Sequence, residues 1–107
     1  DVPAADEGEP LDINGLIIDE DRHTASYEGK KLGLTKTEFD LLITLAKHKT
    51  KVYTREQLLY KVWGDDFYGD NRVVDVHIRR LRSKIEAITP IEFVRTIRGV
   101  GYKFAEF

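Results

Sequence analysis

The chain has 107 residues, which fits one small domain, and its 41% of hydrophobic residues is enough for a single core. It contains no cysteine, which excludes disulfides and thiolate metal sites. No apolar run approaches the roughly 20 residues needed to cross a bilayer, and the first ten residues lack the basic and apolar regions of a signal peptide. We therefore expect a soluble, cytoplasmic domain.

Charge is distributed unevenly along the chain, whose net charge is −2. Residues 1–28 carry nine acids and one base, a net charge of −8, whereas residues 29–107 carry sixteen bases and ten acids, a net charge of +6. Residues 71–104 carry eight bases and three acids, a net charge of +5. Because attraction to phosphate depends on the local field, the C-terminal third is the candidate basic surface. Charge alone does not separate this interpretation from side chains that merely face solvent.

The chain is expected to begin with a linker and a small sheet. Residues 1–10 are acidic, contain two prolines and are interpreted as the end of an interdomain linker, so the domain is expected to cover residues 11–107. Four short strands are expected at residues 11–13, 16–18, 24–27 and 31–34. Asn14-Gly15 is a strong hairpin signal because both residues tolerate positive φ, and Glu28-Gly29-Lys30 predicts a second hairpin. These strands predict an antiparallel sheet with one buried face.

Two capping boxes predict the helices that follow. Thr35 with Glu38, and Thr54 with Gln57, each pair a hydroxyl acceptor with a side chain three residues later. The apolar residues at helical spacing are Phe39, Leu42, Leu45 and Ala46 in the first helix and Leu58, Leu59, Val62 and Trp63 in the second. The second helix is expected to stop at Gly64, a common residue at helix ends.

A loop, a third helix and a hairpin complete the predicted order. The loop of residues 64–70 has two glycines, three acids and two aromatic residues, and the helix is expected to cover residues 71–86. The hairpin is expected to comprise a strand at 92–97, a turn at 98–101 and a returning strand at 102–104.

The predicted third helix has an apolar stripe and an opposite basic face when residues are spaced by about 100°. The apolar stripe contains Val74, Ile78, Leu81 and Ile85, and the basic face contains Arg72, Val76, Arg79, Arg80 and Ser83. Asp75 and Arg82 lie on one flank of the basic face, and Val73, His77 and Lys84 lie on the other.

Val76 is the informative residue of this face, because a solvated face gains nothing from valine. In a major groove, apolar side chains read the thymine methyl group and arginine reads guanine. The alternative is a helix packed on both sides inside a larger assembly. Arg98, at the tip of the predicted hairpin, suits the negative potential of a minor groove, although an arginine on an ordinary turn is also common.

These segments together resemble the effector domain of OmpR/PhoB-type response regulators, over residues 11–105. The segments that carry the resemblance are 34–42 (LTKTEFDLL), 53–59 (YTREQLL), 62–64 (VWG), 72–85 (RVVDVHIRRLRSKI) and 96–102 (TIRGVGY). The resemblance implies an α+β fold, a winged helix-turn-helix with an N-terminal four-stranded antiparallel sheet, a three-helix bundle and a C-terminal β-hairpin wing. It also implies sequence-specific binding of double-stranded DNA in the control of transcription.

The resemblance also implies roles for individual residues, with helix 71–86 in the major groove and wing 92–104 in the minor groove. Base contacts are implied for Val76, Arg80 and Val73. Contacts with the phosphates of the DNA backbone or with edge bases are implied for Arg72, His77, Arg79 and Arg82. Contacts with the backbone near the wing are implied for Thr96 and Tyr102. Arg98 is implied to reach the minor groove. Val73 departs from the threonine often found at its position, so a hydroxyl contact would be lost and site preference could differ.

The family implies three kinds of partner. The loop of Asp65, Asp66, Phe67 and Tyr68 would contact RNA polymerase, with the alternative that Phe67 and Tyr68 only pin the loop to the core. A receiver domain, not contained in this chain, would be phosphorylated by a sensor histidine kinase. Direct-repeat DNA would be bound by head-to-tail dimers driven mainly by the receiver, so this domain alone is expected to be monomeric.

Two other functional classes were weighed. An enzyme is disfavoured because His23, His48 and His77 fall in different predicted elements and no motif of a zinc protease, phosphate loop or cysteine nucleophile is present. We therefore expect no catalytic residue, no metal and no cofactor. A protein-only interaction module is the second alternative, because some winged helices bind proteins. The basic face with its central valine and the wing arginine favour DNA over that alternative.

Overall fold

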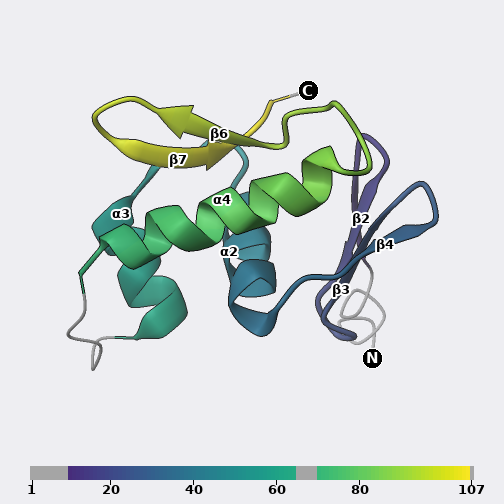
Figure 1. Cartoon of the computed structure of the whole chain (residues 1–107), viewed down its shortest axis with the longest axis horizontal. Coiled ribbons are helices and arrows are strands. Elements are labelled where there is room, and N and C mark those ends of the chain that lie inside the picture. Colours follow the sequence, from purple (N-terminus) through teal and green to yellow (C-terminus); the bar gives the residue numbers. More distant parts are fainter. Residues whose placement is uncertain (1–9, 65–69, 107) are drawn as a thin grey trace, which may run out of the picture.

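The computed structural model describes residues 10–64 and 70–106, which form a four-stranded and a three-stranded antiparallel sheet with helices between them in the chain. Figure 1 shows the four-stranded sheet at one end of the molecule and the hairpin of the other sheet along the long C-terminal helix. The predicted order of sheet, helices and hairpin is confirmed, and so is the α+β fold class. Within the described residues, no helix is long and apolar enough to cross a membrane.

The N-terminal sheet has the strand order β1-β2-β3-β4. Its strands are β1 (Leu11–Ile13), β2 (Leu16–Asp19), β3 (Thr24–Tyr27) and β4 (Lys30–Leu32). Asn14 and Gly15 both have positive φ, 53° and 94°, as the predicted turn requires. Glu28 and Gly29 repeat this pattern with φ of 49° and 84°, so the second turn has only two residues. This is why β4 begins at Lys30, one residue earlier than predicted.

Helix α2 (Lys36–Lys47) begins at the predicted capping box. The Thr35 hydroxyl accepts a hydrogen bond from the Glu38 backbone N–H at 3.2 Å, and a Glu38 carboxylate oxygen accepts one from the Thr35 N–H at 3.0 Å. The predicted stripe of Phe39, Leu42, Leu45 and Ala46 is buried. The box therefore fixes both where α2 starts and which face it turns to the core.

The second helix is shorter and less regular than expected. The predicted box of Thr54 and Gln57 caps α3 (Arg55–Leu58), which continues as the π-helical segment η1 (Leu59–Trp63). The segment ends at Gly64, with φ of 93° and an N–H that donates to the Tyr60 carbonyl at 2.9 Å. Wider π-helical spacing rotates side chains away from the stripe predicted for an α-helix. Leu58 is accordingly fully buried, whereas Leu59, Val62 and Trp63 are only partly buried.

The C-terminal hairpin belongs to a three-stranded sheet that the sequence did not predict. Strand β7 (Gly101–Phe104) lies between β6 (Val94–Ile97) and a two-residue strand, β5 (Tyr53–Thr54). Compared with the predicted strands, β6 begins two residues later and β7 begins one residue earlier. Tyr53 pairs with Tyr102 and Thr54 pairs with Gly101, so the hairpin is tied to the start of α3.

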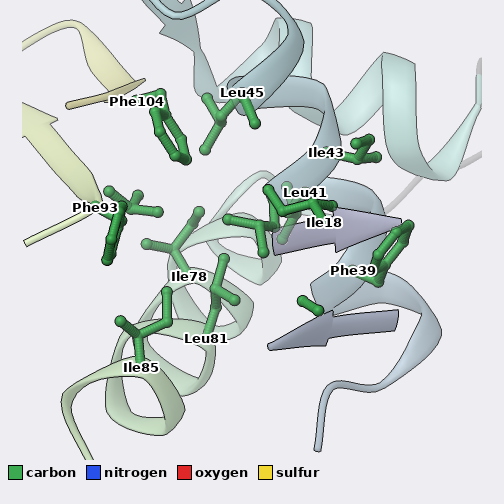
Figure 2. Packing of buried hydrophobic residues seen from close by; sticks show 14 of the residues in the cluster. Ile18, Phe39, Leu41, Ile43, Leu45, Ile78, Leu81, Ile85, Phe93 and Phe104 are labelled. Carbon is green, nitrogen blue, oxygen red and sulfur yellow. The ribbon is translucent and has the colours of Figure 1, made fainter. Parts of the chain in front are cut away.

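The core lies between α2, the C-terminal helix α4 (Arg72–Glu86) and the hairpin. Figure 2 shows Ile78 and Leu81 of α4 pointing toward the side chains of α2, with Phe93 and Phe104 packed beside them. The stripe predicted for this helix, Val74, Ile78, Leu81 and Ile85, is at most 3% exposed. Burial of this stripe leaves the opposite face of α4 in solvent.

One charged contact joins α2 and α4 at the edge of this core. The Glu38 side chain is 2% exposed, and the Lys84 ammonium group lies 2.7 Å from its carboxylate and 2.8 Å from the Gly33 carbonyl oxygen. Burial alone would raise the pKa of Glu38. The hydrogen bonds from Lys84 and from the Thr35 N–H outweigh burial and hold the pKa of Glu38 below its usual range.

We expect Lys84→Met to lower the free energy of unfolding at neutral pH by about 1–2 kcal/mol, because a buried carboxylate loses its charged partner. A lowered pKa stabilises the folded state above pH 4.5, and this contribution is lost as the pH falls through the folded-state value. The cost of Lys84→Met should therefore shrink in acid. Urea unfolding at neutral pH and at acid pH measures the cost of the substitution and its dependence on pH.

Lys36→Met, which removes an exposed pair with Asp40, is the control and should cost less than about 0.5 kcal/mol. An equal cost for the two variants would contradict this prediction.

Candidate nucleic-acid interface

The outer face of α4 matches the basic face drawn from the sequence. Its exposed residues include Arg72, Val76, Arg79, Arg80 and Ser83. Val76 is 36% exposed, although α4 has a complete buried stripe on its other side. Neither Arg79 nor Arg80 forms an ion pair with another of the described residues. The face therefore presents an apolar side chain between two guanidinium groups that are available to a ligand.

Arg72 stands at the start of α4 and is held by the residue before the helix. Its guanidinium lies 2.7 Å from the Asp70 carboxylate, and its backbone N–H donates to the same carboxylate at 2.9 Å. Asp70 thus caps the helix, a role that the Asn71 side chain does not take. The Arg72 hydrogen bonds lower the pKa of Asp70. Because the Arg72 side chain is 82% exposed, this pair is open to exchange with an anionic ligand.

The flank that carries Val73 and His77 is partly buried. Val73 packs against the core cluster. The His77 ring donates from Nδ1 to the Val73 carbonyl oxygen over 2.9 Å, and its ring lies edge-on to Trp63, with the ring centroids 5.3 Å apart. These contacts fix the orientation of the imidazole and connect α4 to η1.

The wing presents Arg98 at an exposed tip. Gly99 follows with φ of 75°, a left-handed conformation that favours glycine, and the Val100 N–H donates to the Ile97 carbonyl oxygen at 2.9 Å. Val100 is 45% exposed. The tip lies toward the end of the molecule where α4 begins (Figure 1). A tight turn of this kind holds an arginine and a valine clear of the domain surface.

Arg82 joins α4 to the first strand of the wing. Its guanidinium donates from Nε to the Val94 carbonyl oxygen at 3.1 Å and from Nη2 to the Thr96 hydroxyl. The same guanidinium lies 5.4 Å from the centroid of the Tyr102 ring. The Arg82 and Thr96 side chains are therefore hydrogen-bonded to each other.

Asp75 joins α4 to the second strand of the wing and to α3. The Tyr102 hydroxyl donates to one Asp75 carboxylate oxygen, and the Arg55 Nε lies 2.8 and 3.0 Å from the two oxygens. Burial raises the pKa of Asp75, but the hydrogen bonds from Tyr102 and Arg55 outweigh it and the pKa is lowered. Burial, together with the bond to Asp75, raises the pKa of Tyr102. Asp75 lies on the predicted flank of the basic face, whereas no pattern in the sequence indicated the contact with Arg55.

A polar groove of about 380 Å³ runs between α4 and the wing. It is lined by Arg55, Asp75, Ile78, Arg79, Arg82, Ser83, Glu86 and Tyr102. The lining has three arginines and two acids, and Arg55 is paired with Asp75, so Arg79 and Arg82 supply its remaining positive charge. Of the contact residues predicted from the sequence, Arg79, Arg82 and Tyr102 line this groove, whereas the predicted base readers and Arg98 are not part of its lining.

The remaining predicted site is the loop proposed to contact RNA polymerase. Asp65, Asp66, Phe67 and Tyr68 lie outside the described residues. Among the residues that the structure describes, no group of three histidines or acids is placed to hold a metal ion.

Comparison with known proteins identifies the family. The family described as "Transcriptional regulatory protein, C terminal" matches residues 29–104. Response regulator ArlR of Staphylococcus epidermidis is 48% identical over 92 residues, which cover 86% of this chain and 42% of ArlR. The chain spans about two fifths of the length of the curated relatives that it matches.

Solved structures agree with this assignment. The DNA-binding domain of Klebsiella pneumoniae RstA, in complex with the RstA box, is 33% identical with a TM-score of 0.78, over 91% of this chain and 97% of that one. Response regulator DrrB of Thermotoga maritima, an OmpR/PhoB homologue, is 39% identical with a TM-score of 0.80, over 92% of this chain and 45% of that one. This family is a class of transcription regulators and not a class of enzymes. The chain belongs to it, as the C-terminal winged helix-turn-helix DNA-binding domain of an OmpR/PhoB-type response regulator.

Proposed function

We propose that this domain binds double-stranded DNA sequence-specifically, with α4 in the major groove and the wing of β6 and β7 at the minor groove. The observation that carries the proposal is the exposed Val76 between Arg79 and Arg80 on α4, two arginines that form no ion pair with another described residue. In a major groove, the guanidinium groups can bind base edges and the valine can contact a thymine methyl group, whereas in solvent the exposed valine has no such partner. The relative RstA, whose DNA-binding domain was solved with its box, supports the same kind of target.

The proposed contacts fall into two groups. Val76 and Arg80, with Val73 beside them, read bases. Backbone contacts are proposed for Arg72, His77, Arg79, Arg82, Thr96 and Tyr102. For Arg72, DNA binding exchanges the Asp70 carboxylate for a phosphate. This exchange costs little, because phosphate accepts a bidentate guanidinium as well as a carboxylate does. Arg82 and Thr96 are bonded to each other, so they meet the backbone as one unit.

Arg98 is proposed to enter the minor groove, and Arg98→Ala is expected to weaken binding about 5-fold to 10-fold where the flanking DNA is A·T-rich. A·T-rich DNA narrows the minor groove and strengthens its negative potential, which an arginine side chain reads. Arg98→Lys keeps the charge without the planar guanidinium and should restore only part of the affinity. Fluorescence anisotropy on duplexes that differ only in the flank measures the effect. A loss that does not depend on the flank would reject minor-groove reading.

The whole protein's partners are also part of the proposal. Residues 64–70 would contact RNA polymerase, and a receiver domain outside this chain would be phosphorylated by a sensor histidine kinase. Two copies would bind a direct-repeat operator head to tail, whereas this domain alone would be monomeric. These partners place the working protein in the cytoplasm. ArlR, named a response regulator and more than twice as long as the matched segment, supports the view that such a domain works as part of a longer chain.

A salt titration separates DNA binding from a protein-only function. Anisotropy of a labelled random duplex should show binding that falls steeply with salt, with a slope of about −5 in log–log form if about six phosphates are neutralised. If the domain showed no affinity for the labelled duplex at low salt, the result would contradict the proposal. That outcome would favour the protein-interaction alternative.

A further inference from the structure

We propose that Asp75 is a positioning residue that sets the orientation of the wing relative to α4, by holding Tyr102 of β7 and Arg55 of α3 at the same time. This inference rests on the proposed function, because the orientation matters only if the helix and the wing read one DNA duplex together.

The contacts of Asp75 connect three elements that are far apart in sequence. Arg55 lies 20 residues before Asp75 and binds both carboxylate oxygens through Nε, whereas Tyr102 lies 27 residues after it and donates its hydroxyl. The Asp75 side chain is 27% exposed, so water competes only partly for these bonds. The carboxylate is the acceptor on which both donors converge.

Asp75 and Arg82 attach the wing to α4 at two points. Seven residues separate them, so they share one face of α4 and stand about 10 Å apart along the helix axis. Asp75 holds β7 through Tyr102, and Arg82 holds β6 through Val94 and Thr96. The pairing of β7 with β5 also holds the hairpin, and the two attachments to α4 add to this pairing and set the angle between the wing and the helix. The Arg82 guanidinium over the Tyr102 ring couples the two points.

The charge of Asp75 argues against a direct role at the ligand. A carboxylate beside a basic face repels phosphate, and Arg79 is the nearby arginine of that face whose charge also acts on Asp75. Hydrogen bonds from Tyr102 and Arg55 keep the pKa of Asp75 low, so the repulsive charge persists at neutral pH. Removal of the charge alone would therefore tighten binding to any DNA. A loss of specific binding would instead indicate that the orientation of the wing has changed.

The first arm of the test measures DNA binding by Asp75→Asn. We expect binding to duplexes with A·T-rich flanks to weaken about 5-fold to 10-fold, with loss of the preference for A·T-rich over G·C-rich flanks and no loss on random DNA. The effect of Arg98→Ala should shrink in the Asp75→Asn background, because a displaced wing no longer delivers Arg98. Asp40→Asn is the matched control, since Asp40 is 24% exposed and also accepts from a basic residue, Lys36. Equal or tighter binding by Asp75→Asn on all duplexes, with the flank preference intact, would overturn the proposal.

The second arm needs no DNA. The chain has no cysteine, so Glu86→Cys and Val100→Cys introduce unique sites for a pair of spin labels, one at the end of α4 and one at the wing tip. Asp75→Asn should broaden or shift the distribution of distances between the labels, and Asp40→Asn should not. An unchanged distribution would overturn the proposal. If the parent domain fails to bind DNA, the proposed function fails, but this arm still decides whether Asp75 orients the wing.

A second variant protects the test if Asp75→Asn does not fold. Arg55→Gln removes one of the two donors and leaves the Tyr102 contact, so it should change the label distances and the flank preference in the same direction but less. Arg55→Gln with an unaltered flank preference and unaltered distances would count against the proposal.

Discussion

Replacing Gly101 with alanine is expected to lower the free energy of unfolding by about 3 kcal/mol or more. A Cβ atom at Gly101 would lie 1.9 Å from the Tyr53 carbonyl oxygen and 2.9 Å from the Thr54 Cα atom, and both of these are backbone atoms. Backbone cannot move aside as a side chain does, so β5 and β7 would have to separate. Because this pairing ties the wing to the start of α3, the variant should also lose DNA affinity.

Gly33→Ala is the matched control, because nothing lies within 4 Å of a Cβ atom at Gly33 and its φ is not in the left-handed region. We expect that variant to be neutral or slightly stabilising. Denaturant unfolding of the two variants and the parent domain, followed by circular dichroism, measures the difference. Equal stability of Gly101→Ala and Gly33→Ala would contradict the close approach of β5 and β7.

Arg80→Ala is expected to cost about 1–3 kcal/mol of binding free energy on a preferred site and to blur the base preference at one position. Arg80 is exposed on α4 beside Val76 and has no ion pair with another described residue, so its guanidinium is available for a bidentate contact with guanine. Anisotropy on the preferred duplex and on single-position variants of it measures both effects.

Arg22→Ala is the control for Arg80→Ala. Arg22 is an exposed arginine in the turn between β2 and β3, and it pairs only weakly with Asp19, at 3.8 Å. Its loss should leave base preference unchanged. If Arg80→Ala lost as much affinity on random DNA as on the preferred site, Arg80 would be a phosphate contact and not a base reader.

Local signals were sufficient to predict most of the fold. Asn14-Gly15 and the Thr35 and Thr54 boxes act over two to four residues, and the structure has a turn or a helix start at each of them. The buried stripe of α4 followed from its period alone. Signals of this kind are independent of the rest of the chain, which is why they can be read from sequence.

The elements that sequence analysis missed depend on contacts between distant segments. A two-residue strand such as β5 has no alternating pattern, and it exists because Tyr53 pairs with Tyr102 in β7. The π-helical spacing of η1 likewise has no signature in the apolar pattern, so three residues expected in the core are only partly buried.

The candidate site divides in the same way. The exposed face of α4 was predictable because helical geometry fixes which side chains share a side, and the turn at Arg98 followed from its glycines. The partners of Asp75 and Arg82 were not predictable, because Arg55 reaches Asp75 only after α3 packs against α4, and Thr96 reaches Arg82 only after the hairpin does. These contacts hold the wing against α4, and they involve Arg82, Thr96 and Tyr102, which are also proposed to meet the DNA backbone.

Selection from a random duplex pool tests the central claim most directly. The labelled pool would be mixed with the domain near physiological salt, and the bound fraction would be sequenced after several rounds. Our account predicts enrichment of a short motif with an A·T-rich flank, and loss of one preferred base of that motif when Arg80→Ala is used. Binding without enrichment of any motif would leave only a phosphate-binding surface and would contradict sequence-specific reading by α4.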